Sequence, residues 1–226
     1  MKIVVIGAGV IGTATAYFLA GDGHQVTVLD RAYEAAAETS FANGGLLTPS
    51  LSDPWNAPGV GRALLRYLGR EDSPLLLRLK ALPSLAFWGI RFLANATPER
   101  FRRNMAANAA LSFYNLQVLD ALLADEGLDF DYQTSGTLKV VRDPQALAAT
   151  VELADATRAL GVDYEVLDHD GIIGVEPALA PIAGRLAGGV HFPEDRFGDA
   201  AKFTRGLARA AEARGVSFEY GVAVEG

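Results

Sequence analysis

The chain has 226 residues, half of them hydrophobic, and a formal net charge of −7 at pH 7. This length and composition suffice for one or two globular domains with a buried core, and the acidic balance argues against a nucleic-acid partner. The chain has no cysteine, which excludes disulfides, thiolate metal sites, iron–sulfur clusters, a cysteine nucleophile and a flavin attached through cysteine. Its histidines, His24, His169 and His191, are far apart in the sequence, so we expect no metal site.

The first 31 residues predict a βαβ unit. The apolar run Ile3–Ile6 leads into Gly7-Ala8-Gly9-Val10-Ile11-Gly12, a helical pattern follows, and a second apolar run, Gln25–Leu29, ends at Asp30. In this motif the first glycine allows a tight turn, the second lets a pyrophosphate approach the backbone, and the third lets the helix pack closely on the strand. Free N–H groups at the helix start favour phosphates, and the Asp30 carboxylate can accept hydrogen bonds from ribose hydroxyls. The motif predicts an adenine dinucleotide and does not by itself separate NAD from FAD.

The N-terminal apolar run is short and interrupted by glycines, so we do not interpret it as a signal peptide. No uncharged apolar run reaches the roughly 18 residues of a membrane-spanning helix. We therefore expect a cytoplasmic protein, with a peripheral position on the inner face of the cell membrane as an open alternative.

The rest of the chain alternates loops, helices and strands. Thr39–Ser50 combines glycines with small polar residues and predicts a loop. Pro98 opens a long predicted helix to Asp125, with Thr97 as its N-cap. The other expected elements are helical pieces in Val60–Ala96, two β-like runs in Phe130–Val141, a helix at Pro144–Leu160, a strand at Tyr164–Leu167, a short helix at Asp170–Glu176, a strand at Leu186–Phe192, a helix at Ala200–Arg214 and a strand at Val216–Tyr220.

This order predicts an α/β fold in which a Rossmann-like nucleotide-binding domain carries an inserted α+β domain. We assign residues 1–50 and 193–226 to the nucleotide-binding domain and residues 51–192 to the insertion. After the last predicted strand a short apolar stretch, Val222–Val224, begins and the chain stops. We therefore expect a truncated chain, either a fragment or half of a longer polypeptide.

The segment Arg62–Arg103 is basic within an otherwise acidic chain. It contains nine Arg or Lys residues and three acids, mixed with leucine, phenylalanine and tryptophan. Such a mixture suits a membrane surface. We favour amphipathic helices that are half buried in a core, with their arginines in solvent, and keep peripheral membrane contact as the alternative.

A second motif reads Thr39-Ser40-Phe41-Ala42-Asn43-Gly44-Gly45. Ser40 and Asn43 can hydrogen-bond a polar ring edge, and the two glycines allow backbone N–H groups close to a flat ligand. Together with Gly7–Gly12 and Asp30-Arg31, this pattern resembles the FAD-dependent D-amino-acid oxidase superfamily, and within it most closely the D-amino-acid dehydrogenases. The resemblance extends along nearly the whole chain, through Ala57–Val60, Thr97–Arg103, Thr134–Leu138, Glu176–Leu179, Gly188–Val190 with Pro193 and Asp195, and Gly198-Asp199 with Phe203-Thr204.

The resemblance implies FAD as the cofactor and an inserted substrate or cap domain. It implies oxidation of a D-amino acid to an imino acid, which hydrolyses to a 2-oxo acid and ammonia, with electrons passed to a quinone or an electron-transfer chain. The implied cofactor-binding residues are Gly7, Ala8, Gly9, Val10, Ile11, Gly12, Asp30 and Arg31, with Ser40, Asn43, Gly44 and Gly45 lining the flavin. The resemblance also implies that relatives usually carry Glu in place of Asp30. Relatives are much longer, and the half of them that this chain lacks supplies further flavin and substrate contacts. We therefore name no catalytic residue and no particular amino acid as substrate.

Three alternatives stay open. The chain could be an FAD-binding subunit or inactive fragment that needs a second polypeptide, or another amine or amino-acid oxidase of the same superfamily. A NAD-dependent enzyme is the third, against which the Thr39–Gly45 loop argues. For the chain alone we expect poor solubility or self-association, weak FAD binding and no oxidation of D-amino acids, because an open apolar sheet edge invites association.

Overall fold

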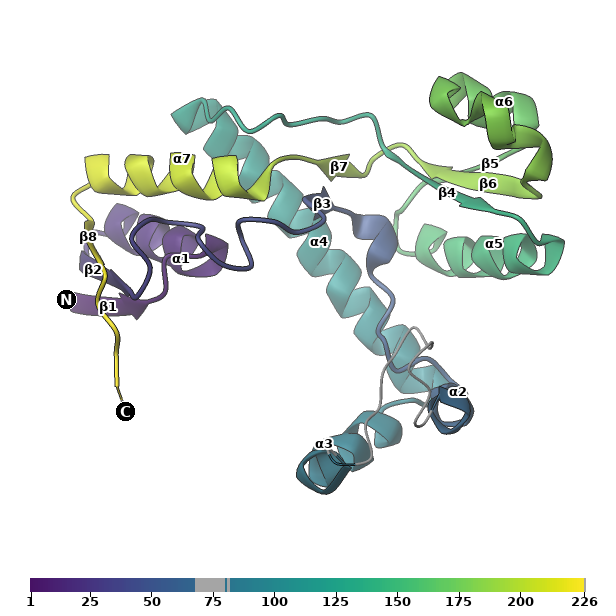
Figure 1. Ribbon diagram of the computed structural model, residues 1–226, viewed down its shortest axis with the longest axis horizontal. Coiled ribbons are helices and arrows are strands. Elements are labelled where there is room, and N and C mark those ends of the chain that lie inside the picture. Colours follow the sequence, from purple (N-terminus) through teal and green to yellow (C-terminus); the bar gives the residue numbers. More distant parts are fainter. Residues whose placement is uncertain (68–79, 81, 226) are drawn as a thin grey trace. The chain divides into compact units, whose positions relative to one another are not determined.

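The computed structural model describes residues 1–67, 80 and 82–225, and the chain divides into two compact units (Figure 1). Unit 1 contains residues 1–48, 115–138 and 193–226, and unit 2 contains residues 49–114 and 139–192. Unit 1 joins residues 115–138 to the segments 1–48 and 193–226, whereas the sequence led us to expect one continuous insertion over residues 51–192. The functions assigned to those ranges remain predictions.

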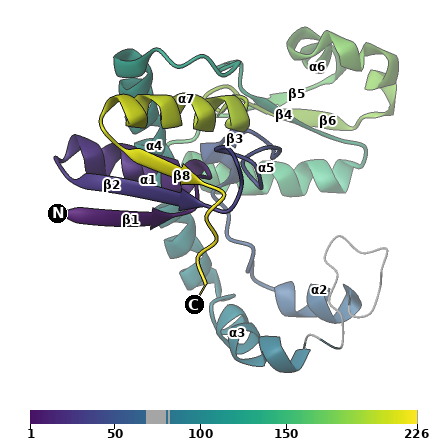
Figure 2. The ribbon, with the colours of Figure 1, turned by 60° about the vertical axis from the view of Figure 1, so that its left-hand side comes forward.

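Unit 1 contains the predicted βαβ unit. Strand β1 (Lys2–Ile6), helix α1 (Val10–Gly21) and strand β2 (Gln25–Asp30) follow one another, and β8 (Ser217–Tyr220) lies parallel beside β2 in a sheet of order β1-β2-β8 (Figure 2). Helix α7 (Ala200–Ala213) packs against α1. The α/β architecture predicted from the sequence is confirmed for this unit, whereas Val222–Val224 forms no strand.

The core of unit 1 lies on one side of this sheet. Buried side chains of α1, β2 and α7 share a single cluster that includes Ala16, Tyr17, Val26, Val28 and Leu207. On the other side of the sheet, none of the described strand residues is buried.

This open side is most evident on β1. Val4 and Ile6 are 61% and 69% exposed, whereas Val5, which points the other way, packs against the core. Parallel sheets are normally covered on both faces, so β1 presents an apolar face without a partner in the described part of the chain.

A second, short pairing in unit 1 gathers segments that are far apart in the sequence. Strand β3 (Leu46–Leu47) pairs antiparallel with β7 (Arg196–Phe197), and Gln133 forms an isolated bridge to Phe197. The end of the glycine-rich loop therefore lies against residues 130–133 and 196–198.

Helix α4 (Pro98–Glu126) begins in unit 2 and ends in unit 1. The predicted cap at its start is present, because the backbone N–H of Arg100 donates to Thr97 Oγ1 at 3.4 Å. At its end, the Glu126 carboxylate accepts hydrogen bonds from Tyr17 Oη at 2.6 Å and from Arg214 Nη2 at 2.7 Å. The Arg214 guanidinium also lies 4.1 Å from the centre of the Tyr17 ring. These contacts tie α1, α4 and α7 together.

We expect the free energy of unfolding of Tyr17→Phe to fall less than that of wild type between pH 10 and 12. Burial, followed by the hydrogen bond to Glu126, raises the pKa of Tyr17 from 10.0 to about 12, so its stabilising contribution is complete below pH 10 and is lost as the pH rises to 12. At neutral pH the variant should lose about 1.5–3 kcal/mol of unfolding free energy, the usual effect of a hydrogen bond to a charged group. Urea unfolding across this pH range tests it, with the exposed Tyr114→Phe as control. An equal alkaline loss in wild type and Tyr17→Phe would show that this hydroxyl is not responsible.

Unit 2 contains a sheet of order β4-β6-β5, formed by β4 (Thr137–Val141), β5 (Glu165–Leu167) and β6 (Gly188–Phe192). Helix α5 (Pro144–Arg158) contributes to the buried cluster on this sheet, which includes Val190 and Phe192. Helix α6 (His169–Val175) and the 3₁₀ helix η3 (Pro177–Arg185) follow β5, and the sequence reading missed η3.

Only one of the two β-like runs expected in Phe130–Val141 forms a strand. The first run is interrupted because Asp131 has φ 56°, a conformation that a regular strand does not contain, whereas Gly136, with φ 80°, lies in the turn expected between the two runs.

The remaining described elements of unit 2 are the 3₁₀ helix η1 (Pro49–Leu51) and helices α2 (Val60–Tyr67) and α3 (Leu82–Ala94). Residues 68–79 and 81 of the basic segment lie outside the described residues. Among the described helices, none combines the length and apolar character needed to cross a membrane.

We expected the helices of the basic segment to be half buried, and for α3 this expectation is wrong. Its side chains Phe87 and Ile90 are 73% and 68% exposed. Hydrogen bonds near the C-terminal end of α3 attach it to the rest of unit 2. Asn56 Nδ2 donates to the Phe92 carbonyl at 3.4 Å, and Arg100 Nη1 donates to the Ala94 carbonyl at 2.7 Å.

Candidate functional site

The glycine turn connects β1 to α1 through positions where a side chain would not fit. Gly7 has φ 102°, a left-handed conformation that favours glycine. A Cβ atom on Gly12 would lie 1.9 Å from the Gly7 carbonyl oxygen, so strand and helix approach as closely as the sequence motif predicts. Within the described part of the chain, a Cβ on Gly9 would meet only Ser40 Oγ, at 3.3 Å. The backbone at Gly9 is therefore open to a ligand.

The start of α1 suits an anion. Gly9 is the N-cap and provides no side-chain cap, and the first turn contains no acidic residue. The N–H of Val10 donates to Ser40 Oγ at 3.0 Å, which attaches the second loop to the helix start. The first N–H groups of a helix have no partner within the helix and carry a partial positive charge. A pyrophosphate is the ligand this arrangement fits.

Asp30 has a structural role in addition to the predicted one. Its Oδ2 accepts a hydrogen bond from the N–H of Ala8 at 2.6 Å, and its Oδ1 accepts one from the N–H of Ala32 at 2.8 Å. The end of β2 is thereby fixed to the glycine turn. Two oxygens offer about four acceptor positions, so this carboxylate keeps capacity for ribose hydroxyls.

We expect Asp30→Ala to weaken FAD binding by at least tenfold. Each lost hydrogen bond to the carboxylate corresponds to about 1.5–3 kcal/mol, and the N–H of Ala8 loses its partner in the glycine turn. Fluorescence titration with FAD measures the affinity, and Asp22→Ala, which removes an exposed acid at the end of α1, is the matched control. Unchanged affinity in Asp30→Ala would place the adenosine elsewhere.

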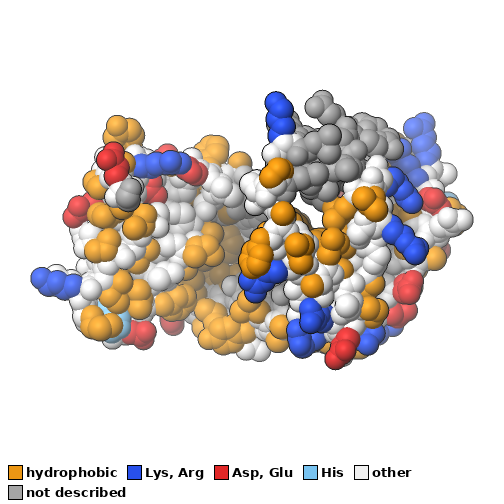
Figure 3. Space-filling model, turned by 90° about the horizontal axis from the view of Figure 1, so that it is seen from below, with side chains coloured by type: hydrophobic (Ala, Val, Ile, Leu, Met, Phe, Trp, Pro, Cys, Tyr) orange, Lys and Arg blue, Asp and Glu red, His pale blue; other side chains and the backbone are white. Residues whose placement is uncertain are grey.

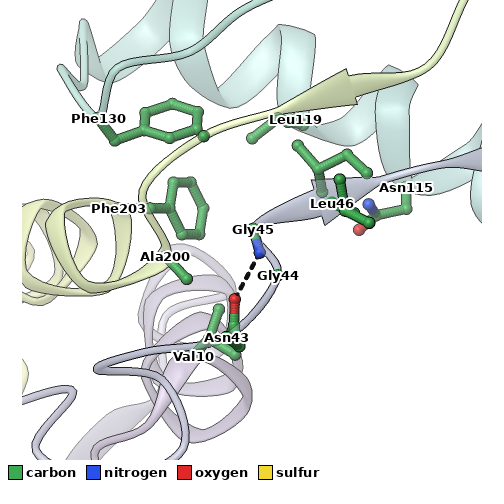
Figure 4. Close-up of a pocket in the computed structure, with 12 residues that line it drawn as sticks. Val10, Asn43, Gly44, Gly45, Leu46, Asn115, Leu119, Phe130, Ala200 and Phe203 are labelled. Carbon is green, nitrogen blue, oxygen red and sulfur yellow. Dashed lines mark hydrogen bonds between the residues drawn. The ribbon is translucent and has the colours of Figure 1, made fainter. Parts of the chain in front are cut away.

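A cavity of about 400 Å³ lies beside the turn, and all of its walls belong to unit 1 (Figure 4). Its floor and sides are mostly apolar or glycine. The lining residues are Val10, Asn43, Gly44, Gly45, Leu46, Leu47, Asn115, Leu119, Phe130, Gly198, Ala200 and Phe203.

Glycines shape the loop side of this cavity. Gly45 has φ 59°, and a Cβ there would lie 2.1 Å from the Gly198 carbonyl oxygen. The N–H of Gly198 donates to the Gly45 carbonyl at 2.9 Å, so the two backbones are in direct contact. A Cβ on Gly198 would lie 2.5 Å from the Phe130 ring. The pocket therefore depends on glycine at both positions.

The polar side chains of the lining are two amides. Asn43 Oδ1 accepts the N–H of Gly45 at 2.8 Å, as Figure 4 shows, which holds the loop in its turn. Its amide nitrogen then remains as a donor. Asn115 contributes the second amide from α4. Apolar walls with a few polar groups suit a flat ring that has a polar edge.

The structure brings some predicted site residues together and separates others. Val10, Asn43, Gly44 and Gly45 line the cavity, whereas the rest of the glycine motif and Asp30 form the adjacent turn. Ser40 is buried between the two and binds the helix start instead of the cavity wall. Arg31 points to Glu38, to which its Nε donates at 2.9 Å, and its side chain is 72% exposed.

Apart from Val10, sequence reasoning missed the cavity walls outside the loop. Asn115 and Leu119 lie four positions apart on α4 and therefore share one side of the helix. That spacing is also typical of an ordinary core-facing helix, so it could not identify these two residues as part of a cavity. Gly198 and Phe203 lie in segments that resemble the oxidase superfamily, but the sequence assigned neither residue a role in the site.

Comparison with known proteins adds independent findings. A family model described as FAD dependent oxidoreductase matches residues 2–226. The chain is 44% identical over 225 residues to the D-amino acid dehydrogenase of Dechloromonas aromatica, and 43% identical over 226 residues to that of Xanthobacter autotrophicus. Each match covers 100% of this chain and 54% of the relative. The chain thus spans about half the length of the curated relatives it matches.

A solved structure shows the same fold. The L-α-glycerophosphate oxidase of Mycoplasma pneumoniae, with FAD bound, superposes with a TM-score of 0.57 at 19% sequence identity. The superposition covers 97% of this chain and 44% of that one. At this identity the likeness concerns the fold.

Proposed function

The chain belongs to the FAD-dependent oxidoreductase family, and from this premise we propose that its complete protein oxidises D-amino acids to 2-oxo acids and ammonia. The electrons pass to a quinone-type acceptor at a membrane that the protein contacts peripherally. The observation that carries the proposal is the joint presence, in one unit, of the glycine turn and the adjoining cavity. The identity to D-amino acid dehydrogenases over the whole chain supports the substrate class.

FAD fits the residues that are present. The turn at Gly9 leaves backbone open for a pyrophosphate, and Asp30 stands at the end of β2 where a ribose would be bound. Bound FAD supplies the acceptor for the hydride that leaves the α-carbon of the amino acid. This chain's own residues bind and orient the cofactor: the turn holds the phosphates, and the Asn43 amide nitrogen offers a hydrogen bond to the polar ring edge.

The apolar walls of the cavity have a further role in this proposal. Leu119, Phe130 and Phe203 line the cavity and would exclude water from a ring bound there, which would strengthen each remaining polar contact. The imino acid product hydrolyses in water without help from the protein. No residue of the chain is assigned a proton transfer.

We further propose that a second stretch of polypeptide, equivalent to the part of the relatives that this chain does not match, completes the active protein. The support is the open face of β1, where Val4 and Ile6 are exposed. An apolar parallel strand with one uncovered face is a surface that proteins normally bury.

A complementation assay tests both parts of the proposal. The chain is expressed alone, and together with the segment of the Dechloromonas aromatica relative that lies outside the match, and each sample is given FAD, D-alanine and a redox dye. We expect dye reduction with D-alanine, none with L-alanine, and activity only when both segments are present. Turnover by the chain alone would overturn the need for a second polypeptide. A folded, flavin-containing complex that oxidises other amines but no D-amino acid would overturn the substrate class.

A further inference from the structure

A second pocket lies in unit 2, where α3, the start of α4 and the loop before α2 meet. Its volume is about 500 Å³, within the range of sites for small molecules. The lining residues that the structure describes all belong to unit 2, and none of them lines the cavity beside the glycine turn. They are three aromatic residues, one arginine and three asparagines. We call this site the unit 2 pocket.

Aromatic rings from α3 form one wall of the unit 2 pocket. The rings are those of Phe87, Trp88 and Phe92. Trp88 and Phe92 are stacked, with ring centres 5.0 Å apart, and Phe87 and Trp88 are 73% and 58% exposed. Figure 3, seen from the side on which α2 and α3 lie in Figure 1, shows hydrophobic side chains among basic ones over this part of unit 2. Such a wall suits an aromatic or other large apolar group of a ligand.

Arg91 adds a positive charge beside these rings. Its guanidinium lies 5.6 Å from the centre of the Phe87 ring. Within the part of the chain that the structure describes, Arg91 forms no ion pair. A guanidinium presents its N–H donors in a plane that matches the two oxygens of a carboxylate. The unit 2 pocket can therefore hold a carboxylate next to an apolar group.

The three asparagines add acceptors for hydrogen bonds. Asn56 Nδ2 donates to the Phe92 carbonyl at 3.4 Å. Asn95 Nδ2 donates to the Arg91 carbonyl at 2.7 Å. Both side chains keep their amide oxygens as acceptors. Asn104, on α4, is half buried and forms no hydrogen bond with the residues that the structure describes. Acceptor oxygens beside aromatic rings suit an ammonium group, which donates to the oxygens and is attracted by the rings.

The guanidinium, the amide oxygens and the rings together match one class of molecule. An α-amino acid carries a carboxylate, an ammonium and a side chain on the same carbon atom, so it can meet all three kinds of group at once. A 2-oxo acid lacks the ammonium and an amine lacks the carboxylate, so each would leave part of the lining unused. We propose that the unit 2 pocket is an accessory binding site for a free α-amino acid with an aromatic or large apolar side chain. This site goes beyond the proposed oxidation and does not depend on it.

Trp88 provides an optical readout of binding. The chain has two tryptophans, and Trp55→Phe leaves Trp88 as the only one. In this parent variant, without FAD, Trp88 emission is followed during titration with each enantiomer of phenylalanine, excited where phenylalanine does not absorb. The enantiomer that binds more tightly is compared with hydrocinnamate, phenethylamine and alanine, which lack the ammonium, the carboxylate and the ring in turn. We expect a saturable change with phenylalanine and binding of each analogue that is weaker by about tenfold or more.

Further variants locate the binding. Arg91→Gln removes the charge that meets the carboxylate, and Asn104→Ala removes an amide of the lining, so each should weaken phenylalanine binding about tenfold. Arg142→Gln and Gln145→Ala change an exposed arginine and an exposed amide elsewhere in unit 2, and should bind as the parent does. Circular dichroism shows whether each variant is folded.

Three results would overturn the proposal. The first is the absence of a saturable change with either enantiomer of phenylalanine. The second is equal affinity for hydrocinnamate or phenethylamine, which would show that the pocket does not recognise an amino acid. The third is unchanged affinity in folded Arg91→Gln, which would place the binding elsewhere in the protein. The titration involves neither FAD nor turnover, so its outcome is independent of whether the complete protein oxidises D-amino acids.

Discussion

Gly12→Ala is expected to abolish flavin retention and to destabilise unit 1. The new Cβ would lie 1.9 Å from the Gly7 carbonyl oxygen, which is a backbone atom and cannot move without opening the turn. Overpacking of this kind costs about 3 kcal/mol or more, and here it also displaces the helix start from the phosphate position. Gel filtration, with the absorbance of flavin that elutes with the protein, measures flavin retention. Urea unfolding measures the loss of stability.

Gly21→Ala is the control, because it places a methyl group on the same helix where the nearest atom is the end of the Arg214 side chain, at 3.3 Å. A flexible side chain can move aside, so this variant should keep its flavin. If Gly12→Ala also eluted with flavin at the wild-type ratio, the close approach of strand and helix would not be needed for binding.

Gly45→Ala should have the second largest effect. At φ 59° alanine is strained, and its Cβ would lie 2.1 Å from the Gly198 carbonyl oxygen. The substitution therefore separates β3 from β7 and deforms the cavity. We expect a loss of about 2–4 kcal/mol in unfolding free energy and a reduction of FAD affinity by at least tenfold.

The neighbouring glycine provides a matched control for that variant. A Cβ on Gly44 would meet only the Leu46 side chain, at 3.6 Å, an ordinary contact. Gly44→Ala should thus bind FAD within a few-fold of wild type. Equal losses in the two variants, measured by flavin fluorescence, would mean that the loop needs flexibility in general and not the contact between Gly45 and Gly198.

The sequence predicted those elements that are determined by residues close together in the chain, namely the β1–α1–β2 unit and the starts of α4 and α7. The glycines at 7, 9 and 12 and the alternation of apolar residues determine the β1–α1–β2 unit, and Thr97 with Pro98 marks the start of α4. Asp199 caps α7 by accepting the N–H of Lys202 at 2.8 Å, and the helix begins at the predicted residue.

Other features depend on contacts between distant segments and were not predictable in this way. The carboxylate of Asp30 is bound to the backbone of Ala8, a contact set by the parallel pairing of β1 and β2. The cavity wall from Leu119 and Phe130 arises because residues 115–138 join the other segments of unit 1, which no periodicity reveals. The exposure of α3 likewise follows from which elements pack around it, since its composition alone resembles that of a core helix.

In the proposed function, FAD is held at the glycine turn of unit 1. Titration of wild type and of Gly9→Val with FAD, and separately with NAD, tests this binding. The added branches would occupy the pyrophosphate position. Among the described residues, this Cβ would meet only Ser40 Oγ, at 3.3 Å, so the fold should survive as judged by circular dichroism. We predict saturable quenching of flavin fluorescence by wild type, none by folded Gly9→Val, and no binding of NAD by either. Wild-type affinity for FAD in a folded Gly9→Val variant, or preference of the wild type for NAD, would show that the turn is not the FAD site.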